Sequence, residues 1–433
     1  MKKIIYTLIL NAIAVTTLVA QVPVPVKAQD NPILLIGGVA HLGNGQVIQN
    51  SAIGFDKGKI TRVENASGNV NTDGYTVVQI DGKHVYPGFI LPNSQVGLAE
   101  VSAVRAMRDN AETGSLNPNV RSIISYNTDS ENIATFRFNG VLLAETAPTG
   151  GRISGTSSVV EMEGWNWEDA AHTVDMGVHL NWPNRMNQRF DFATFTVKTE
   201  PNKNYDKQVA DLSMHFKDAI AYGADEGKVA NLKLEAMQGL FDGTKILFMH
   251  AGEAKGIVES VLFAQGNGVK KIVIVSAGSA LIVADFLKDN DIGVIIPPTH
   301  RMPERTDADV YGPYKLPAQL IEAGLTVSME HRGMLGHGRN LPFFAGTAAS
   351  YGLDKEEALK MITSNTAKLL GIDGRVGTLE VGKDATLFVS EGDALDFRTN
   401  ILSHAFISGK QVMLNNKQQE LFERYSRKYG HID

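Results

Sequence analysis

Two amides stand two residues apart at the end of an apolar run. The run covers residues 85–91, is punctuated by Pro87-Gly88, and leads into Asn93 and Gln95. Side chains at i and i+2 of a strand point to the same face, so both amides are predicted to project together from the strand end. Neutral amide oxygens suit hard cations better than zinc, and an amide pair also suits a polar ligand.

Other polar residues end later apolar runs. His250 ends the run 245–249, and Glu330 and Arg332 follow the run 325–329 two residues apart. A histidine or carboxylate can act as general acid or base, and a guanidinium binds carboxylates through paired hydrogen bonds. The basic segments 300–305 and 331–340 predict a rim for a carboxylate-bearing small molecule. The alternatives are a structural, hydrogen-bonded His250 and solvated loops with ordinary surface charges.

These residues need a scaffold that brings strand ends together. Over residues 86–375, continuous apolar runs alternate with helical segments at 254–266, 281–289, 316–323, 341–351 and 354–370. Such alternation is typical of a parallel sheet, and at this length it favours an α/β, TIM-type (β/α)8 barrel. Catalytic groups in such barrels lie at the carboxyl ends of the strands. The least regular region is 99–207.

The two ends of the chain both predict β-structure. Short alternating runs with turn residues fill 33–85, and hairpin patterns recur at 377–389 and 404–412. We expect one small β-sandwich built from both ends. The predicted organisation is a signal peptide at 1–28, sandwich segments at 30–85 and 376–415, the barrel at 86–375, and a tail at 416–433.

The composition excludes several classes of protein. The net charge of −6 provides no basic surface for nucleic acid, and phosphate-binding glycine motifs are missing. There is no Cys, which excludes disulfides and Cys-ligated zinc. Lys2-Lys3 followed by an apolar segment at 4–20 predicts a secretory signal cleaved after Ala20 or Ala28, export to the periplasm, and no membrane span after cleavage. The alternative is an uncleaved membrane anchor.

Several segments carry a family resemblance. These are PGFILPNSQ at 87–95, NLPFFAG at 340–346, YGL at 351–353, EAL at 357–359, NTA at 365–367 and GTLEVGKDATL at 377–387. Together they resemble the amidohydrolase superfamily, in its imidazolonepropionase-like branch. The resemblance implies a barrel with an adjoining sandwich, hydrolysis of carbon–nitrogen bonds other than peptide bonds, such as those of cyclic amides, and zinc or another divalent metal.

The resemblance also places the family's metal ligands, and most are replaced. The two His of the first strand fall at Asn93 and Gln95, the fifth-strand His at His250, the sixth-strand His at Ser276, and the eighth-strand Asp at Arg332. A shift of one residue would give the last role to His331. The family's bridging Lys or Glu has no assigned position. Zinc needs about three protein ligands, so we predict weak zinc binding or none, and the cofactor stays undefined.

Two functions fit this pattern. The first is a hydrolase with a rebuilt site, in which the predicted catalytic residues are His250, Glu330 and His331, and the predicted substrate-binding residues are Asn93, Gln95, Ser276, Arg301 and Arg332. The second is an inactive barrel that binds a small molecule, or that forms a homo- or hetero-oligomer with an active homologue. The replaced positions remain polar, which indicates a pocket still in use.

Overall fold

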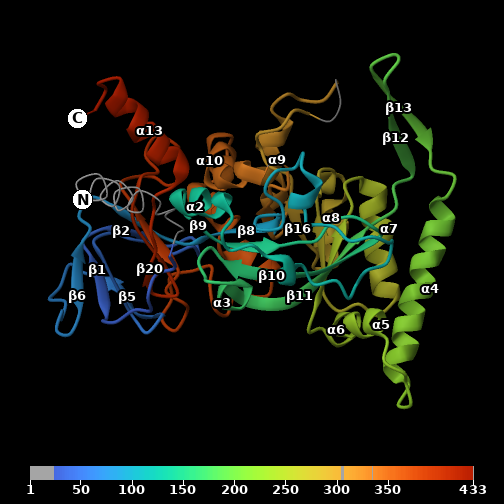
Figure 1. Ribbon diagram of the computed structural model, residues 1–433, viewed down its shortest axis with the longest axis horizontal. Helices are drawn as coiled ribbons and strands as arrows, with labels where there is room; N and C mark the ends of the chain where they lie inside the picture. The colour runs from blue at the N-terminus through green and yellow to red at the C-terminus, as the bar shows by residue number, and fades with distance from the viewer. Residues whose placement is uncertain (1–23, 304–306, 334, 433) are drawn as a thin grey trace, which may run out of the picture.

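A computed structural model describes residues 24–303, 307–333 and 335–432. It shows a β-rich unit beside a barrel, with a helical and hairpin extension at the far end (Figure 1). Most of the predicted signal peptide, residues 1–23, lies outside the described residues. No helix within the described ranges is both long and apolar enough to cross a membrane.

Both chain ends build the β-rich unit, as predicted. β7 (His84–Pro87) pairs antiparallel with β18 (Leu387–Ser390), which joins the two ends in one sheet. That sheet has the order β20 (Lys410–Gln411), β19 (Leu402–Ile407), β18, β7, β2 (Val39–His41), β3 (Val47–Ile48). The second sheet has the order β5 (Lys59–Asn65), β4 (Ser51–Asp56), β1 (Ile33–Ile36), β6 (Thr76–Gln79). One apolar core, which includes Phe55 and Phe406, joins them.

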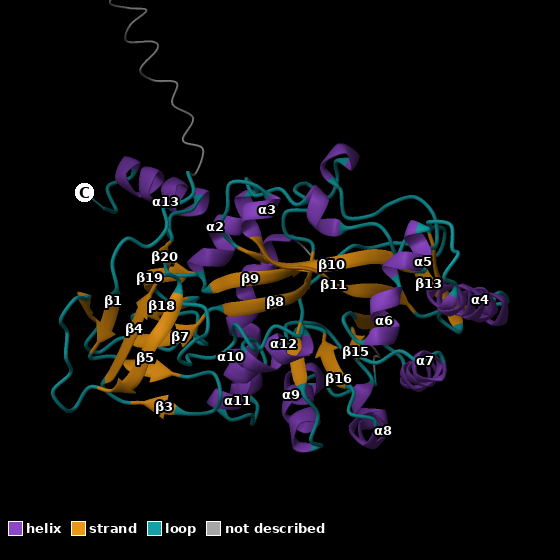
Figure 2. Cartoon of the chain, turned by 90° about the horizontal axis from the view of Figure 1, so that it is seen from below, coloured by secondary structure: helices purple, strands orange, loops and turns teal. Residues whose placement is uncertain are grey.

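The barrel is an eight-stranded sheet whose first and last strands contact each other, so that it is nearly closed (Figure 2). Its order is β17 (Val327–Met329), β16 (Gly293–Ile296), β15 (Ile272–Val275), β14 (Ile246–His250), β11 (Ala171–Asn181), β10 (Ile153–Glu161), β9 (Val141–Thr146), β8 (Phe89–Ser94). The pairs are parallel except that β10 runs antiparallel to both neighbours. The predicted α/β barrel is therefore present, with one reversed strand.

The helices predicted in the second half of the barrel are found close to their predicted positions. They are α7 (Ala254–Gly266), η3 (Ala280–Val283), α8 (Ala284–Asp289), α9 (Gly312–Glu322), α10 (Leu341–Ser350), α11 (Lys355–Lys360) and α12 (Ser364–Leu369). A capping side chain fixes the start of α11. The Asp354 side chain accepts hydrogen bonds from the backbone N–H groups of Glu356 and Glu357 and so caps α11.

The remaining helices are shorter or lie at the periphery. They are η1 (Arg105–Met107), η2 (Ser122–Ser125), α2 (Glu131–Phe138), α3 (Trp167–Ala170), α4 (Tyr205–Ala224), α5 (Leu232–Ala236), α6 (Gln238–Asp242), η4 (Leu335–Asn340) and α13 (Lys417–Lys428). α13 occupies most of the predicted tail.

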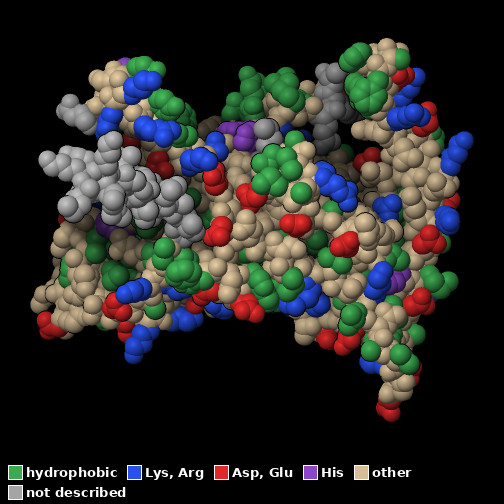
Figure 3. Space-filling model, viewed as in Figure 1, with side chains coloured by type: hydrophobic (Ala, Val, Ile, Leu, Met, Phe, Trp, Pro, Cys, Tyr) green, Lys and Arg blue, Asp and Glu red, His purple; other side chains and the backbone are tan. Residues whose placement is uncertain are grey.

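The region 99–207 is more regular than its sequence indicates. It contains the barrel strands β9, β10 and β11 and a separate hairpin of β12 (Met186–Asp191) and β13 (Thr196–Pro201). β11 carries His172, Asp175 and His179 among its apolar residues, so its pattern does not indicate a buried strand. The hairpin stands away from the barrel at the upper right of Figure 3, where apolar side chains gather, and its Phe192 and Phe195 are exposed. Elsewhere on that face, acidic and basic side chains are intermixed (Figure 3).

Candidate active site

A network of polar side chains joins the carboxyl ends of six barrel strands. The residues come from β8, β9, β11, β14 and the positions after β15 and β17; they are Asn93, Glu145, His179, His250, Ser276, Glu330 and Arg332. Parallel strands of a barrel end at one face, which is where barrel enzymes carry their chemistry. The network contains two carboxylates, one pair of imidazoles and one guanidinium.

The first carboxylate, Glu145, is fully buried and accepts hydrogen bonds on both oxygens. Its Oε2 accepts from the backbone N–H of Asn93 at 2.8 Å. Its Oε1 accepts from Ser157 Oγ at 2.7 Å and contacts His179 Nε2 at 2.9 Å. Three donors therefore compensate the carboxylate for its lost hydration.

A pair of imidazoles leads from Glu145 toward the barrel mouth. His179 Nδ1 lies 2.9 Å from His250 Nε2, and His250 Nδ1 lies 3.4 Å from the Arg332 guanidinium. A guanidinium only donates, so His250 Nδ1 is the acceptor. One set of tautomers then satisfies every contact: His250 Nε2–H donates to His179 Nδ1, and His179 Nε2–H donates to Glu145.

Burial is the main reason that the pKa of His250 lies well below its ordinary value, and electrostatic interactions with His179 and Arg332 lower it further. His250 is therefore neutral at neutral pH, as the tautomer assignment requires. Burial also lowers the pKa of Arg332, while nearby Glu330 raises it.

The second carboxylate, Glu330, directly follows β17 and is 4 % exposed. Its Oε1 accepts a hydrogen bond from Ser276 Oγ at 2.7 Å, and its Oε2 accepts one from the Asn93 side-chain amide. Burial raises the pKa of Glu330, and the bonds from Ser276 and Asn93 and the charge on Arg332 partly offset this. A carboxylate with a raised pKa is suited to take up and release a proton.

Asn93 connects the two carboxylates. Its backbone N–H donates to Glu145 and its side-chain amide donates to Glu330. It adopts φ +50°, in the left-handed region that asparagine tolerates better than most residues. Its buried Oδ1 has no hydrogen-bond partner among the described residues. Because an unsatisfied buried acceptor is costly, a donor on a bound molecule would be favoured here.

Gln95 does not join Asn93 in these contacts. β8 ends at Ser94, and the left-handed Asn93 interrupts the alternation on which the i, i+2 argument depended. Gln95 Oε1 instead accepts a hydrogen bond from Asn110 Nδ2 at 3.1 Å. The structure thus assigns the two predicted amides to different neighbours.

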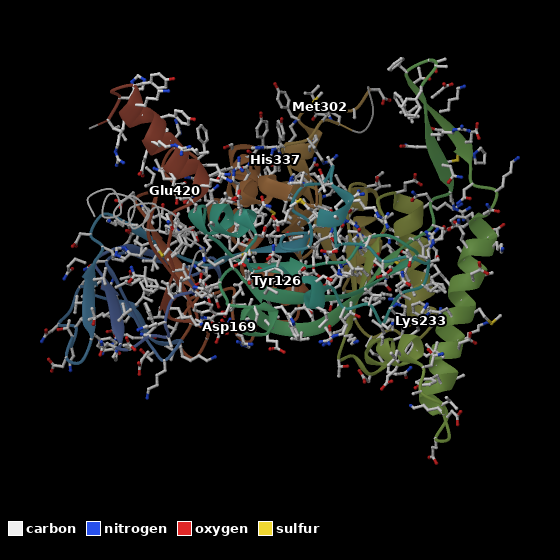
Figure 4. The ribbon with its side chains drawn as sticks, in the orientation of Figure 1. Tyr126, Asp169, Lys233, Met302, His337 and Glu420 are labelled. Atoms are coloured by element: carbon white, nitrogen blue, oxygen red, sulfur yellow. The ribbon has the colours of Figure 1, made fainter. Side chains whose placement is uncertain are left out.

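The other predicted rim residues lie in the loops after β16 and β17. The backbone N–H of Arg301 donates to the Thr299 carbonyl at 2.7 Å. The ring of His331 lies 5.8 Å from that of His337, which is labelled in Figure 4, and 5.5 Å from that of Phe344. The catalytic role of His331 and the substrate-binding role of Arg301 stay predictions.

A cavity of about 510 Å³ lies beside α10 and is lined in part by His300, Thr347, Lys355 and Arg398. His300 Nε2 lies 2.7 Å from Thr347 Oγ1 on its wall. The network residues do not line this cavity. We place the candidate site at the network, because the acid–base groups converge there.

The comparisons with known proteins agree with this architecture. A model of the amidohydrolase family matches residues 315–414. A stretch of 104 residues is 34% identical to imidazolonepropionase from Syntrophobacter fumaroxidans, and it covers 23% of this chain and 23% of that protein. The amidohydrolase from Thermotoga maritima aligns over 88% of this chain and 99% of its own, with a TM-score of 0.76 and 21% identity.

The chain is thus similar to the amidohydrolase family in sequence over residues 315–414 and to amidohydrolases in overall fold. A prolidase complexed with N-methylphosphonate-L-proline shares the fold, with a TM-score of 0.54 and 16% identity over 88% of this chain and 99% of its own. The sequence match to the curated relative spans about a quarter of that relative's length. The activity of the whole chain therefore depends on its own residues.

The superfamily implies a divalent metal, and the residues present do not fit one. Zinc requires several His, Cys or carboxylate lone pairs directed at one point. Here both nitrogens of His250 face other side chains, both oxygens of Glu330 accept hydrogen bonds, and Arg332 adds a positive charge. Within the described part of the chain, no group of three or more His, Cys, Asp or Glu side chains is arranged to hold a metal ion. Weak zinc binding remains a prediction.

Glu145 and His179 are the network residues that sequence reasoning missed, as it missed Ser157, which supports Glu145 from outside the network. Glu145 ends the apolar run 141–144 much as His250 ends its own run, so a signal was present. His179 lies in β11, whose polar residues concealed the strand. Ser157 belongs to the reversed strand β10 and has no counterpart in a wholly parallel barrel.

Proposed function

We propose that this chain is an exported hydrolase that cleaves a carbon–nitrogen bond other than a peptide bond, such as that of a cyclic amide, in a small carboxylate-bearing substrate. The resemblance to amidohydrolases supports the reaction class. The observation that carries the proposal is a buried carboxylate, Glu330, two residues from a guanidinium, Arg332, at the carboxyl end of the barrel.

Glu330 and Arg332 provide complementary chemistry. Glu330 would take the proton from the oxygen that attacks the carbonyl carbon and later return it to the leaving nitrogen. Arg332, held by His250, would stabilise the negative charge that develops on the carbonyl oxygen. Arg301 on the rim would bind the substrate carboxylate. A fixed guanidinium would thus replace the electrophile that a metal supplies.

The test is turnover of a panel of cyclic amides and dipeptide-like amides, followed by mass spectrometry. Glu330→Gln should lower turnover by about 100- to 10,000-fold, the usual range for a general acid–base group. Glu161→Gln is the matched control. Glu161 also has a pKa raised by burial and accepts from a serine, Ser408, but it ends the reversed strand β10 and contacts the β-rich unit. Equal losses in both variants would contradict the proposal.

A binding role is the second candidate. Both oxygens of Glu330 already accept hydrogen bonds, and Asn93 Oδ1 has no partner in the described part of the chain. These contacts favour a site that recognises a donor without transforming it. The protein would then act as a small-molecule binding protein or as the partner subunit of an active homologue. Calorimetry with the same panel separates the two, because a ligand that binds and is recovered unchanged supports this role.

Export is proposed from residues 1–28 alone. Lys2-Lys3, the apolar segment 4–20 and the small residues Ala20 and Ala28 support a cleaved signal. Amino-terminal sequencing of protein from the periplasmic fraction should begin after Ala20 or Ala28. An intact Met1 in the membrane pellet would contradict export by cleavage.

A further inference from the structure

Ser276 occupies an unusual backbone position directly after β15. Its φ is +59°, in the left-handed region that non-glycine residues seldom adopt. The turn is tight, because the Gly278 N–H donates to the Ser276 carbonyl at 2.8 Å and Gly252 packs against the same carbonyl. Residues held in such conformations cluster at active sites.

The hydroxyl of Ser276 donates to a buried carboxylate. Ser276 Oγ lies 2.7 Å from Glu330 Oε1, and the Asn93 amide fixes the other oxygen of that carboxylate. A hydroxyl within hydrogen-bond reach of a base, with a third group orienting the base, is the arrangement of an activated nucleophile. Ser276 is partly exposed, whereas Glu330 behind it is buried.

A second serine in the barrel shows what a purely structural partner looks like. Ser157 Oγ donates to Glu145 Oε1 at the same distance, 2.7 Å. It is fully buried and lies within the regular strand β10. Ser276 makes the same bond from a left-handed turn and is partly exposed, so satisfying a carboxylate does not explain its position.

We infer that Ser276 is the nucleophile of this hydrolase and that the reaction passes through an acyl-enzyme. The inference rests on the proposed function and specifies its attacking oxygen. Ser276 Oγ bonds to the carbonyl carbon as its proton passes to Glu330. The carbon–nitrogen bond then breaks, and the nitrogen leaves with that proton. Water next attacks the ester and gives its proton to Glu330, and the acid is released as the proton returns to Ser276.

Arg332 and Asn93 have defined parts in this sequence. Arg332, held by His250 and electrostatically coupled to Glu330, would stabilise the oxyanion of both tetrahedral intermediates. The buried Asn93 Oδ1 would accept from the substrate N–H.

The test uses p-nitrophenyl acetate as an acylating probe, followed by acid quenching and peptide mass mapping. An acetyl group should appear on Ser276 in the wild-type protein and in Ser157→Ala, and at least about 100-fold more slowly in Glu330→Gln. Ser276→Gly serves as the loss-of-hydroxyl variant, because glycine adopts positive φ freely and should fold. It should show neither the acetyl group nor amide turnover.

The results separate the inference from the proposed function. If Ser276→Gly keeps wild-type amide turnover while Glu330→Gln loses it, the hydrolase stands and the serine nucleophile is overturned. If Ser276 is acetylated but no amide in the panel is cleaved, the nucleophile is supported and the proposed substrate class fails. A folded wild-type protein that is never acetylated at Ser276 would overturn the inference.

Discussion

The two buried carboxylates of the barrel differ in how the surrounding chain uses them. Glu145 lies in the interior, where the Ser157 hydroxyl, the His179 ring and the Asn93 backbone N–H contact it. Glu330 lies at the mouth, where two donors from left-handed residues, Asn93 and Ser276, hold it beside Arg332. The interior carboxylate is thus held entirely within the barrel, whereas both side-chain donors to the carboxylate at the mouth come from residues with a left-handed backbone.

The largest expected difference is between the two charge-removing variants. Glu330→Gln should lose about 100- to 10,000-fold in turnover and fold normally, because a buried carboxylate with a raised pKa is costly at neutral pH. Glu145→Gln should lose about 1–3 kcal/mol of unfolding free energy, because an amide nitrogen would face existing donors. Kinetics and thermal unfolding of both variants measure this. A loss of stability in Glu330→Gln together with a loss of turnover alone in Glu145→Gln would refute the comparison.

The pH dependence gives the next effect. Because the pKa of His250 is lowered in the folded protein, the unfolded chain binds its proton first as pH falls below about 6.5. The folded state should therefore lose up to about 1.4 kcal/mol per pH unit from this group until the folded pKa is reached. His250→Asn should remove that part of the slope. Denaturant titrations at pH 7 and 5.5 test this, and an unchanged slope would show that His250 is not held neutral in the folded protein.

The contribution of Glu330 to folding stability changes with pH in the opposite direction to that of His250. Its folded pKa is raised, so its protonation favours the folded state, and the stabilisation is lost as pH rises through that pKa. Turnover needs Glu330 in its ionised form. The acidic limb of the pH–rate profile should therefore lie above the usual glutamate pKa of about 4.3. A rate profile whose limb lies below that value would show that Glu330 is not the group that titrates.

The smallest effect concerns access to the two serines. The chain has no Cys, so Ser276→Cys and Ser157→Cys each introduce a single thiol. Ser276 is partly exposed and Ser157 is fully buried, so a disulfide reagent should modify the first thiol and spare the second in the native protein. Equal modification of both would mean that the mouth and the interior do not differ in access.

The second half of the barrel was predictable because its strands are continuous apolar runs separated by short helices. His250, Ser276, Glu330 and Arg332 could thus be placed at strand ends. The first half was not, since β11 mixes His172, Asp175 and His179 into a barrel strand and β10 reverses direction. Local period-two reasoning also failed after Asn93, because a single left-handed residue changes the face to which the next side chains point.

We propose that a carboxylate, Glu330, and a guanidinium, Arg332, rather than a metal, supply the chemistry at the barrel mouth. The most direct measurement is amide turnover by the purified mature protein before and after exhaustive chelation, with bound zinc counted in the same samples. We predict an unchanged rate and zinc far below one equivalent per chain. A rate that disappears on chelation and returns with stoichiometric zinc would contradict the claim.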